Sequence, residues 1–270
     1  SWNIKWSWRS LNNLMALKGG EIRFNTDTMQ LEVWNVNEWT GILATSPEQQ
    51  TGGTRGVVAG GYNGSSTISD MDYMNLDSTG NAIDFGNTSS NQYYAAGFGS
   101  RTHGFTAGKA PASNTISRWV FASTGTFADY SDLSQDRKEA AACSNSTRGV
   151  IMGGERSDIE FITMSSTASG NNFGNLSLGN STRYSNGCGN STRGLIYVGN
   201  LYPSGNASDV IEYVTISTLG DASDFGDYSG GQGDGPMSCA NAVRSIRAGG
   251  GFPAGSVTMD FITISTLGNS

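Results

Sequence analysis

The chain alternates between short apolar runs and polar turns. Val, Ile, Phe and Tyr are common in the runs, and Gly, Ser, Asn and Asp are common between them. Branched and aromatic side chains favour strands, whereas Gly, Asn and Asp favour turns. The pattern therefore predicts many short β-strands and no long helix.

The strand pattern repeats five times along residues 46–270. Each repeat predicts four strands, which we call A to D in chain order: A precedes an anchor residue, B follows it, and C and D come later. The anchors are Thr54, Thr102, Thr147, Thr192 and Val243, so successive anchors are 48, 45, 45 and 51 residues apart. The C runs are residues 71–76, 117–122, 159–164, 211–216 and 259–264, and the D runs are residues 82–87, 127–132, 171–175 and 222–227.

Four strands at a period of about 45 to 50 residues predict the blades of a β-propeller. The A runs contain small residues such as Ala141, Cys143 and Gly187, which suit the crowded innermost strand of a blade. Closing the ring removes unpaired sheet edges. Because the fifth repeat shows no D run, we expect the N-terminal segment to supply that strand; the alternative is that more chain follows Ser270.

The repeats resemble the kelch family of propellers, in which the second strand ends in a Gly-Gly pair and the third carries an aromatic residue. The pairs here are Gly60-Gly61, Gly153-Gly154 and Gly249-Gly250, and the aromatic residues are Tyr73, Trp119, Phe161, Tyr213 and Phe261. Five anchors and this resemblance together imply an all-β, five-bladed, kelch-like propeller over residues 46–270.

Residues 1–45 follow a different pattern. Residues 20–35 alternate between apolar and polar positions on both sides of residues 25–28, which predicts a β-hairpin. Trp39 falls in a third short strand or in the cap of the hairpin.

Residues 20–43 resemble a short module of tail-fibre and other appendage proteins of bacteriophages. Val36 stands where the module usually has Gly. The propeller repeats also resemble repeats in predicted virion proteins of marine, including cyanobacterial, phages. The resemblance implies that residues 1–45 are an adaptor that attaches to other virion proteins or to further copies of this chain. The matching positions are Gly20, Arg23, Phe24, Asn25, Thr26, Leu31, Glu32, Trp34 and Trp39.

Charge and composition argue against several other functions. The formal net charge of −7 disfavours nucleic acid as a partner, because phosphate binding needs a basic face. No run approaches the roughly 18 apolar residues of a membrane-spanning helix. His103 is the single histidine, so we expect no multi-histidine metal site, and we predict no cofactor and no catalytic residue. Cys143, Cys188 and Cys239 share one position in their repeats and are predicted to stay reduced.

Charged residues also recur with the repeat. An arginine follows the anchor in four repeats, and His103 takes its place in the second. An aspartate recurs in the D runs, so we predict that arginine–carboxylate pairs connect neighbouring blades. These structural residues are Arg55, Arg148, Arg193, Arg244, Asp84, Asp129 and Asp224.

The loops joining B to C and D to A vary in length and composition, unlike the strands, and are expected to share one face. Exposed tyrosines among Asn and Asp suit stacking on sugars and hydrogen bonding to them. The candidate ligand-binding residues are Tyr62, Tyr93, Tyr94, Tyr184, Tyr202 and Phe252.

We therefore expect a non-enzymatic structural protein of a phage virion, located on the particle surface. As a tail-fibre or appendage component it would display the propeller for attachment to a host-surface glycan. The alternatives are an extracellular carbohydrate-binding propeller and a propeller hydrolase or lyase outside any virion. A hydrolase would need a pair of carboxylates, and the acidic residues of this sequence recur with the repeat or lie in turns.

Overall fold

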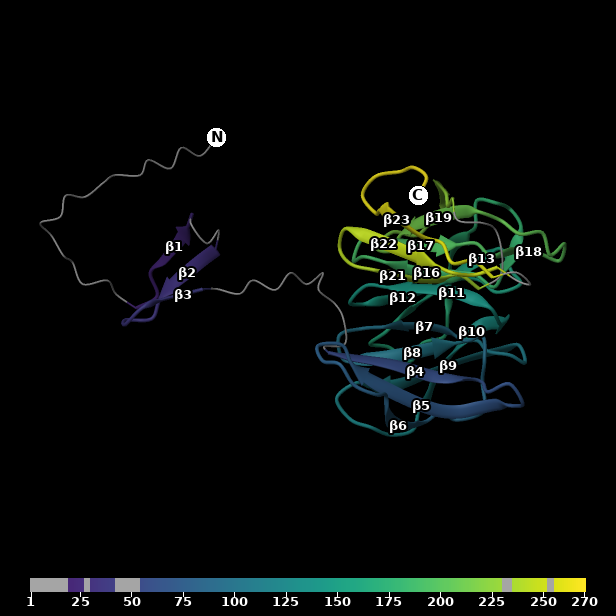
Figure 1. Ribbon diagram of the computed structural model, residues 1–270, viewed down its shortest axis with the longest axis horizontal. Helices are drawn as coiled ribbons and strands as arrows, with labels where there is room; N and C mark the ends of the chain where they lie inside the picture. The colour runs from purple at the N-terminus through teal and green to yellow at the C-terminus, as the bar shows by residue number, and fades with distance from the viewer. Residues whose placement is uncertain (1–18, 27–29, 42–53, 230–234, 252–254) are drawn as a thin grey trace, which may run out of the picture. The chain divides into compact units, whose positions relative to one another are not determined.

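A computed structural model describes residues 19–26, 30–41, 54–229, 235–251 and 255–270 (Figure 1). The chain divides into two compact units, Ser1–Ser46 and Pro47–Ser270. In the described residues the fold is all-β: 23 strands form small antiparallel sheets, and none of these residues is helical. The predicted fold class is confirmed at this level.

The described part of the first unit is one sheet of three strands, β1 (Ile22–Asn25), β2 (Gln30–Trp34) and β3 (Trp39–Gly41). Glu32 is buried and accepts hydrogen bonds from Arg23 Nε (2.7 Å) and Asn25 Nδ2 (2.8 Å). The guanidinium of Arg23 also lies 4.2 Å from the centre of the Trp39 ring. Four of the nine residues that carry the resemblance to the phage module, Arg23, Asn25, Glu32 and Trp39, thus form one network across the three strands.

The turn before β3 contains a strained residue. Val36 has a φ of 85°, in the left-handed region that a β-branched residue rarely adopts. Glycine adopts this conformation without steric cost. The structure therefore explains why glycine suits this position of the module.

In the second unit five sheets follow the five repeats, and a sixth sheet has two strands, β15 (Ser181–Arg183) and β18 (Asn200–Tyr202). In each of the five sheets, successive strands of the sheet pair antiparallel, and in sheet 4 the segment between β17 and β19 contains β18. In Figure 1 the colours run from sheet 1 in blue to sheet 5 in yellow. Residues just before Thr54, where the first A run was expected, lie outside the described residues. Sheet 1 is β4 (Arg55–Tyr62), β5 (Thr67–Asn75) and β6 (Ile83–Asn87); sheet 2 is β7 (Ala96–Gly99), β8 (His103–Ala107), β9 (Ser113–Val120) and β10 (Ala128–Arg137); sheet 3 is β11 (Ala140–Ser144), β12 (Arg148–Gly153), β13 (Asp158–Thr163) and β14 (Asn171–Asn175); sheet 4 is β16 (Asn186–Gly189), β17 (Arg193–Tyr197), β19 (Val210–Thr215) and β20 (Ser223–Asp227); sheet 5 is β21 (Met237–Ala240), β22 (Arg244–Ala248) and β23 (Met259–Thr263).

The A strands of successive sheets lie side by side: β7 contacts β11, β11 contacts β16, and β16 contacts β21. Their backbones approach so closely that a Cβ on Gly187 would lie 2.4 Å from the carbonyl oxygen of Ala142. This explains the small residues of the A runs. The A strands, together with part of β4, line a cavity of about 920 Å³.

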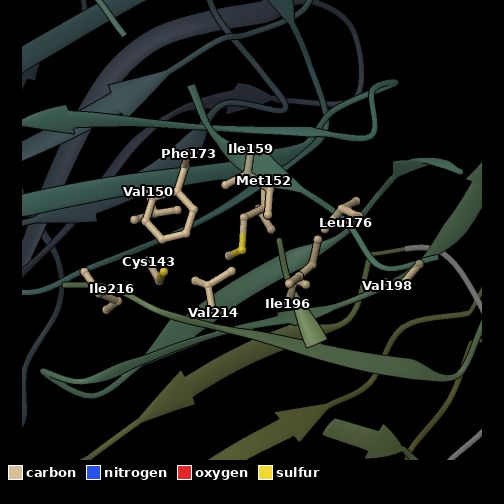
Figure 2. Close-up of a cluster of buried hydrophobic side chains, with 12 residues drawn as sticks. Cys143, Val150, Met152, Ile159, Phe173, Leu176, Ile196, Val198, Val214 and Ile216 are labelled. Carbon is tan, nitrogen blue, oxygen red and sulfur yellow. The ribbon is translucent and has the colours of Figure 1, made fainter. Parts of the chain in front are cut away.

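Apolar side chains fill the space between successive sheets. Figure 2 shows the cluster between sheets 3 and 4, where Val150 and Phe173 of sheet 3 meet Val214 and Ile216 of sheet 4. Three further clusters join sheets 1 and 2, 2 and 3, and 4 and 5. Fully burying one such side chain contributes about 1.5–3 kcal/mol, so these junctions are the main source of stability.

Two sheet faces remain uncovered by any described residue. On sheet 5, Phe261 is 54% exposed, whereas its counterpart Tyr213 in sheet 4 packs against a buried cluster. On the opposite face of sheet 1, Leu76 is 62% exposed, although its counterparts Ile216 and Ile264 are fully buried. Sheets 5 and 1 therefore each present one half of the kind of junction that the other sheets form.

A glycine near the start of the B strand lets sheet 3 pack closely against sheet 2 and sheet 4 against sheet 3, at Gly149 and Gly194. Ser245 holds this position in sheet 5. A Cβ on Gly194 would lie 2.1 Å from Cys143 Sγ of the neighbouring sheet, whereas a Cβ on Gly97 would meet nothing within 4 Å. We predict that Gly194→Ala lowers the free energy of unfolding by about 1–3 kcal/mol through overpacking. Gly97→Ala is the matched control and should stabilise by about 0.4–1 kcal/mol. Urea denaturation of both variants measures the difference; equal effects would contradict the packing observed here.

Candidate functional site

The recurring arginines connect neighbouring sheets. Arg148 lies 4.5 Å above the ring of Phe161 in its own sheet, and its Nη1 donates a hydrogen bond to the Ile216 carbonyl of the next sheet at 2.7 Å. Arg193 repeats this arrangement with Tyr213 at 4.8 Å and the Ile264 carbonyl at 2.6 Å. In the same way Arg55 stacks on Tyr73 and donates to the Phe121 carbonyl, at 4.7 and 2.7 Å.

Sheet 2 makes the connection differently. His103 occupies the arginine position, and Arg118 occupies the aromatic position of the C strand, because β8 pairs Phe105 with Arg118. Trp119, predicted for that position, instead faces sheet 1 and stacks on Phe127 with ring centres 4.3 Å apart. The hydroxyl of Tyr130 donates to the Met164 carbonyl of sheet 3 at 3.0 Å, so a tyrosine replaces the arginine. Burial, and then the charge of Arg118, lower the pKa of His103.

The predicted arginine–aspartate pairs are wrong for the residues that the structure describes. Asp84, Asp129 and Asp224 are exposed and pair with none of the recurring arginines. Asp224 instead accepts a hydrogen bond from the Gly226 amide at 3.0 Å within its own strand. Arg244 stacks on Phe261 at 4.8 Å but donates no hydrogen bond to a described residue of another sheet. A main-chain carbonyl in the adjacent sheet is the nearer acceptor, so the aspartates stay in solvent.

The carboxylates that do connect sheets come from the C strands. Glu160 is buried and accepts hydrogen bonds from the Ser134 amide (2.8 Å) and Arg137 Nη2 (2.7 Å) of sheet 2. Glu212, also buried, accepts from the Ser177 and Leu178 amides at 3.1 and 2.7 Å. Sequence reasoning missed these residues, although an acidic residue inside an apolar C run was a usable signal.

The loops that join B to C and D to A do share one face. The Gly61 amide donates to the Gln92 carbonyl at 2.8 Å, and the Ala110 amide donates to the Tyr93 carbonyl at 2.8 Å. These bonds connect the loops of sheets 1 and 2 directly. The candidate tyrosines therefore project from one side of the second unit, whereas Phe252 lies outside the described residues.

Five tyrosines on this face form a nearly continuous tyrosine array, made of Tyr62, Tyr93, Tyr94, Tyr184 and Tyr202. The ring centres of Tyr62 and Tyr93 lie 6.4 Å apart, those of Tyr93 and Tyr94 4.6 Å, and those of Tyr94 and Tyr184 5.6 Å. Arg183 connects the last two, because its guanidinium lies 5.2 Å from the Tyr184 ring and 5.8 Å from the Tyr202 ring. The array thus brings together residues of sheet 1, of the segment before sheet 2 and of the loops of sheet 4.

The array is open to solvent. Tyr62 is 61% exposed and Tyr94 48%, and a groove of about 540 Å³ lies between Tyr62, Thr67, Tyr93 and Tyr94. An exposed row of aromatic rings with adjacent hydroxyl groups matches the stacking and hydrogen-bonding surface of a sugar chain.

Three residues that precede A strands have left-handed backbone: Tyr94, Glu139 and Tyr184 have φ values of 57°, 60° and 52°. Each such residue costs about 1–2 kcal/mol. All three line one end of the 920 Å³ cavity, and Gly235 holds the same position before sheet 5 with a φ of 65°. These three positions favour glycine by their backbone conformation but carry larger side chains. Backbone strain of this kind clusters at functional sites.

Within the described ranges, no group of three His, Cys, Asp or Glu side chains is placed to hold a metal ion. The same ranges contain no helix of the length and hydropathy that crossing a bilayer requires.

No protein-family model and no curated protein matches the chain.

The three cysteines are free but differ in environment: Cys143 is buried, Cys188 partly buried and Cys239 exposed. Burial raises the pKa of Cys143 well above its usual range, and it also raises the pKa of Cys188. The thiolate is the reactive form, so a raised pKa slows alkylation at any given pH.

We predict that iodoacetamide modifies Cys239 first and Cys143 only after unfolding. At pH about 9 the reaction at Cys143 should still be slow, because burial raises the pKa of its thiol and keeps it protonated. Peptide mass spectrometry over time measures both rates. Equal rates in the native protein would contradict the burial of Cys143.

Proposed function

We propose that this chain is a non-enzymatic component of a phage tail fibre or appendage, in which residues 46–270 form a five-bladed β-propeller that binds a host-surface glycan. The observation that carries the proposal is the tyrosine array, which assembles side chains from several loops into one exposed surface.

Three features support the propeller. The five sheets share one strand order, the described A strands are neighbours, and each described junction has a side chain that donates to a main-chain carbonyl of the next sheet. The uncovered faces of sheets 5 and 1 are complementary: Arg244 lacks a carbonyl acceptor, and Leu76 occupies the position whose carbonyl accepts in the other junctions. In the proposed ring these two faces meet.

The glycan-binding role follows from the chemistry of the array. Aromatic rings stack on the apolar faces of sugars, and their hydroxyl groups exchange hydrogen bonds with sugar hydroxyls. Single contacts are weak, but several copies on one particle multiply the affinity through effective concentration. The buried carboxylates Glu160 and Glu212 are engaged in structural hydrogen bonds, which favours binding over hydrolysis.

The virion role rests on the N-terminal unit. Arg23, Asn25, Glu32 and Trp39, which match the phage module, interact with one another across the sheet. We propose that residues 1–45 attach the chain to other virion proteins or to further copies of itself, on the surface of the particle.

Ring closure is tested by comparing Arg193→Ala with Arg244→Ala. Arg193→Ala removes a stacked guanidinium and a hydrogen bond to a carbonyl, and it should cost about 1–3 kcal/mol of the free energy of unfolding. In a closed five-bladed ring Arg244 donates to the Leu76 carbonyl, so Arg244→Ala should cost a similar amount. Chemical denaturation measures both variants. A negligible effect of Arg244→Ala beside a clear effect of Arg193→Ala would overturn closure.

Glycan binding is tested by replacing Tyr94 and Tyr202 with Ala. Each lost ring removes stacking area, so retention of the protein on immobilised bacterial surface polysaccharides should weaken about tenfold per substitution. Leu219→Ala is the control, because Leu219 is a comparably large exposed apolar residue on the opposite face. Unchanged retention of both tyrosine variants on the polysaccharides would contradict the proposed glycan binding.

A further inference from the structure

We propose that Arg183 makes the glycan site selective for sugars that carry a carboxylate, such as uronic acids. This inference rests on the proposed glycan-binding function and specifies the class of glycan. Its basis is a guanidinium in the tyrosine array that has no polar partner of its own among the described residues.

Arg183 belongs to an addition to the repeat. Strands β15 (Ser181–Arg183) and β18 (Asn200–Tyr202) pair into a two-stranded sheet beside sheet 4. Within the described residues, repeat 2 has only an isolated bridge at the equivalent place, between Tyr93 and Ala110, and no other repeat has a strand pair there. The register aligns Ser181 with Tyr202 and Arg183 with Asn200, so Arg183 and Tyr202 lie diagonally on one face. A departure from the repeat that carries a charged and an aromatic residue points to function.

The guanidinium of Arg183 is held in place by rings rather than by hydrogen bonds. It is half-buried between Tyr184 and Tyr202, and within the described residues it donates no hydrogen bond and forms no ion pair. Arg148 and Arg193 also stack on rings, yet each donates to a carbonyl of the next sheet. Among these three, Arg183 alone donates no hydrogen bond to a described residue. Its Nε is buried, so Nη1 and Nη2 are the donors left for a ligand.

A carboxylate suits this environment. A planar guanidinium binds a carboxylate through two parallel hydrogen bonds, and stacking on aromatic rings orients it beforehand. The adjacent rings of Tyr184 and Tyr202 offer stacking surface to the sugar that bears the carboxylate. Because the chain has a net charge of −7, long-range electrostatics do not attract an acidic glycan, and recognition depends on this short-range pair.

The test compares two probes that differ only in charge: oligomers of galacturonic acid and the same oligomers after reduction of their carboxyl groups to alcohols. Isothermal titration calorimetry on the full chain should show tighter binding of the acidic probe. Arg183→Gln should weaken binding of the acidic probe at least about tenfold and leave binding of the reduced probe unchanged. Arg183→Lys keeps the charge without the paired donors and should lose most of the preference.

Arg101→Gln is the matched control, since Arg101 is exposed in the turn between β7 and β8 on the opposite face. Thermal unfolding of each variant confirms that the fold is intact. Equal binding of the two probes, or an acidic preference that survives Arg183→Gln, overturns the role of Arg183 while leaving glycan binding in place. Binding of neither probe by the unmodified chain overturns this inference. If the unmodified chain is also not retained on surface polysaccharides, the proposed function fails as well.

Discussion

The contact between one sheet and the next determines this structure. An isolated sheet of three or four short strands buries too little apolar surface to persist. Each junction adds an apolar cluster, a close approach at a glycine such as Gly194, and a polar group that ends on a main-chain carbonyl. Since a buried carbonyl without a partner is costly, the arginine both satisfies it and fixes the spacing of the sheets.

The fold was largely predictable from the sequence, because strand-forming residues, turn residues and the repeat period carry its information. The partners of the recurring arginines were not predictable. A carboxylate acceptor can be recognised in the sequence as Asp or Glu, whereas every residue has a main-chain carbonyl. The sequence therefore does not identify Ile216 and Ile264 as the acceptors. In sheet 2 two residues replace the single arginine of the other sheets: Arg118 stacks on the ring of Tyr130, and the Tyr130 hydroxyl donates the hydrogen bond to the next sheet. No periodic pattern in the sequence reveals this division between two residues.

The candidate site was predicted in part. Loop variability identified the face and the tyrosines, because antiparallel meanders bring the B–C and D–A loops to the same side. Arg183 was missed, since it lies in an irregular stretch between repeats and becomes notable only when β15 pairs with β18. The left-handed backbone at Tyr94, Glu139 and Tyr184 could not be predicted either, because tyrosine and glutamate give no sequence signal for that conformation.

The uncovered faces of sheets 5 and 1 affect how stability is distributed along the chain. In a row of repeats that contact only their neighbours, the folding energy is close to a sum over nearest-neighbour terms. Interior sheets 2, 3 and 4 then have two such terms, whereas sheets 1 and 5 have one while their outer faces stay bare. Local opening starts at the ends of such a row, so the amides of sheet 3 are the last to exchange. A closed ring has no ends and opens as one cooperative whole.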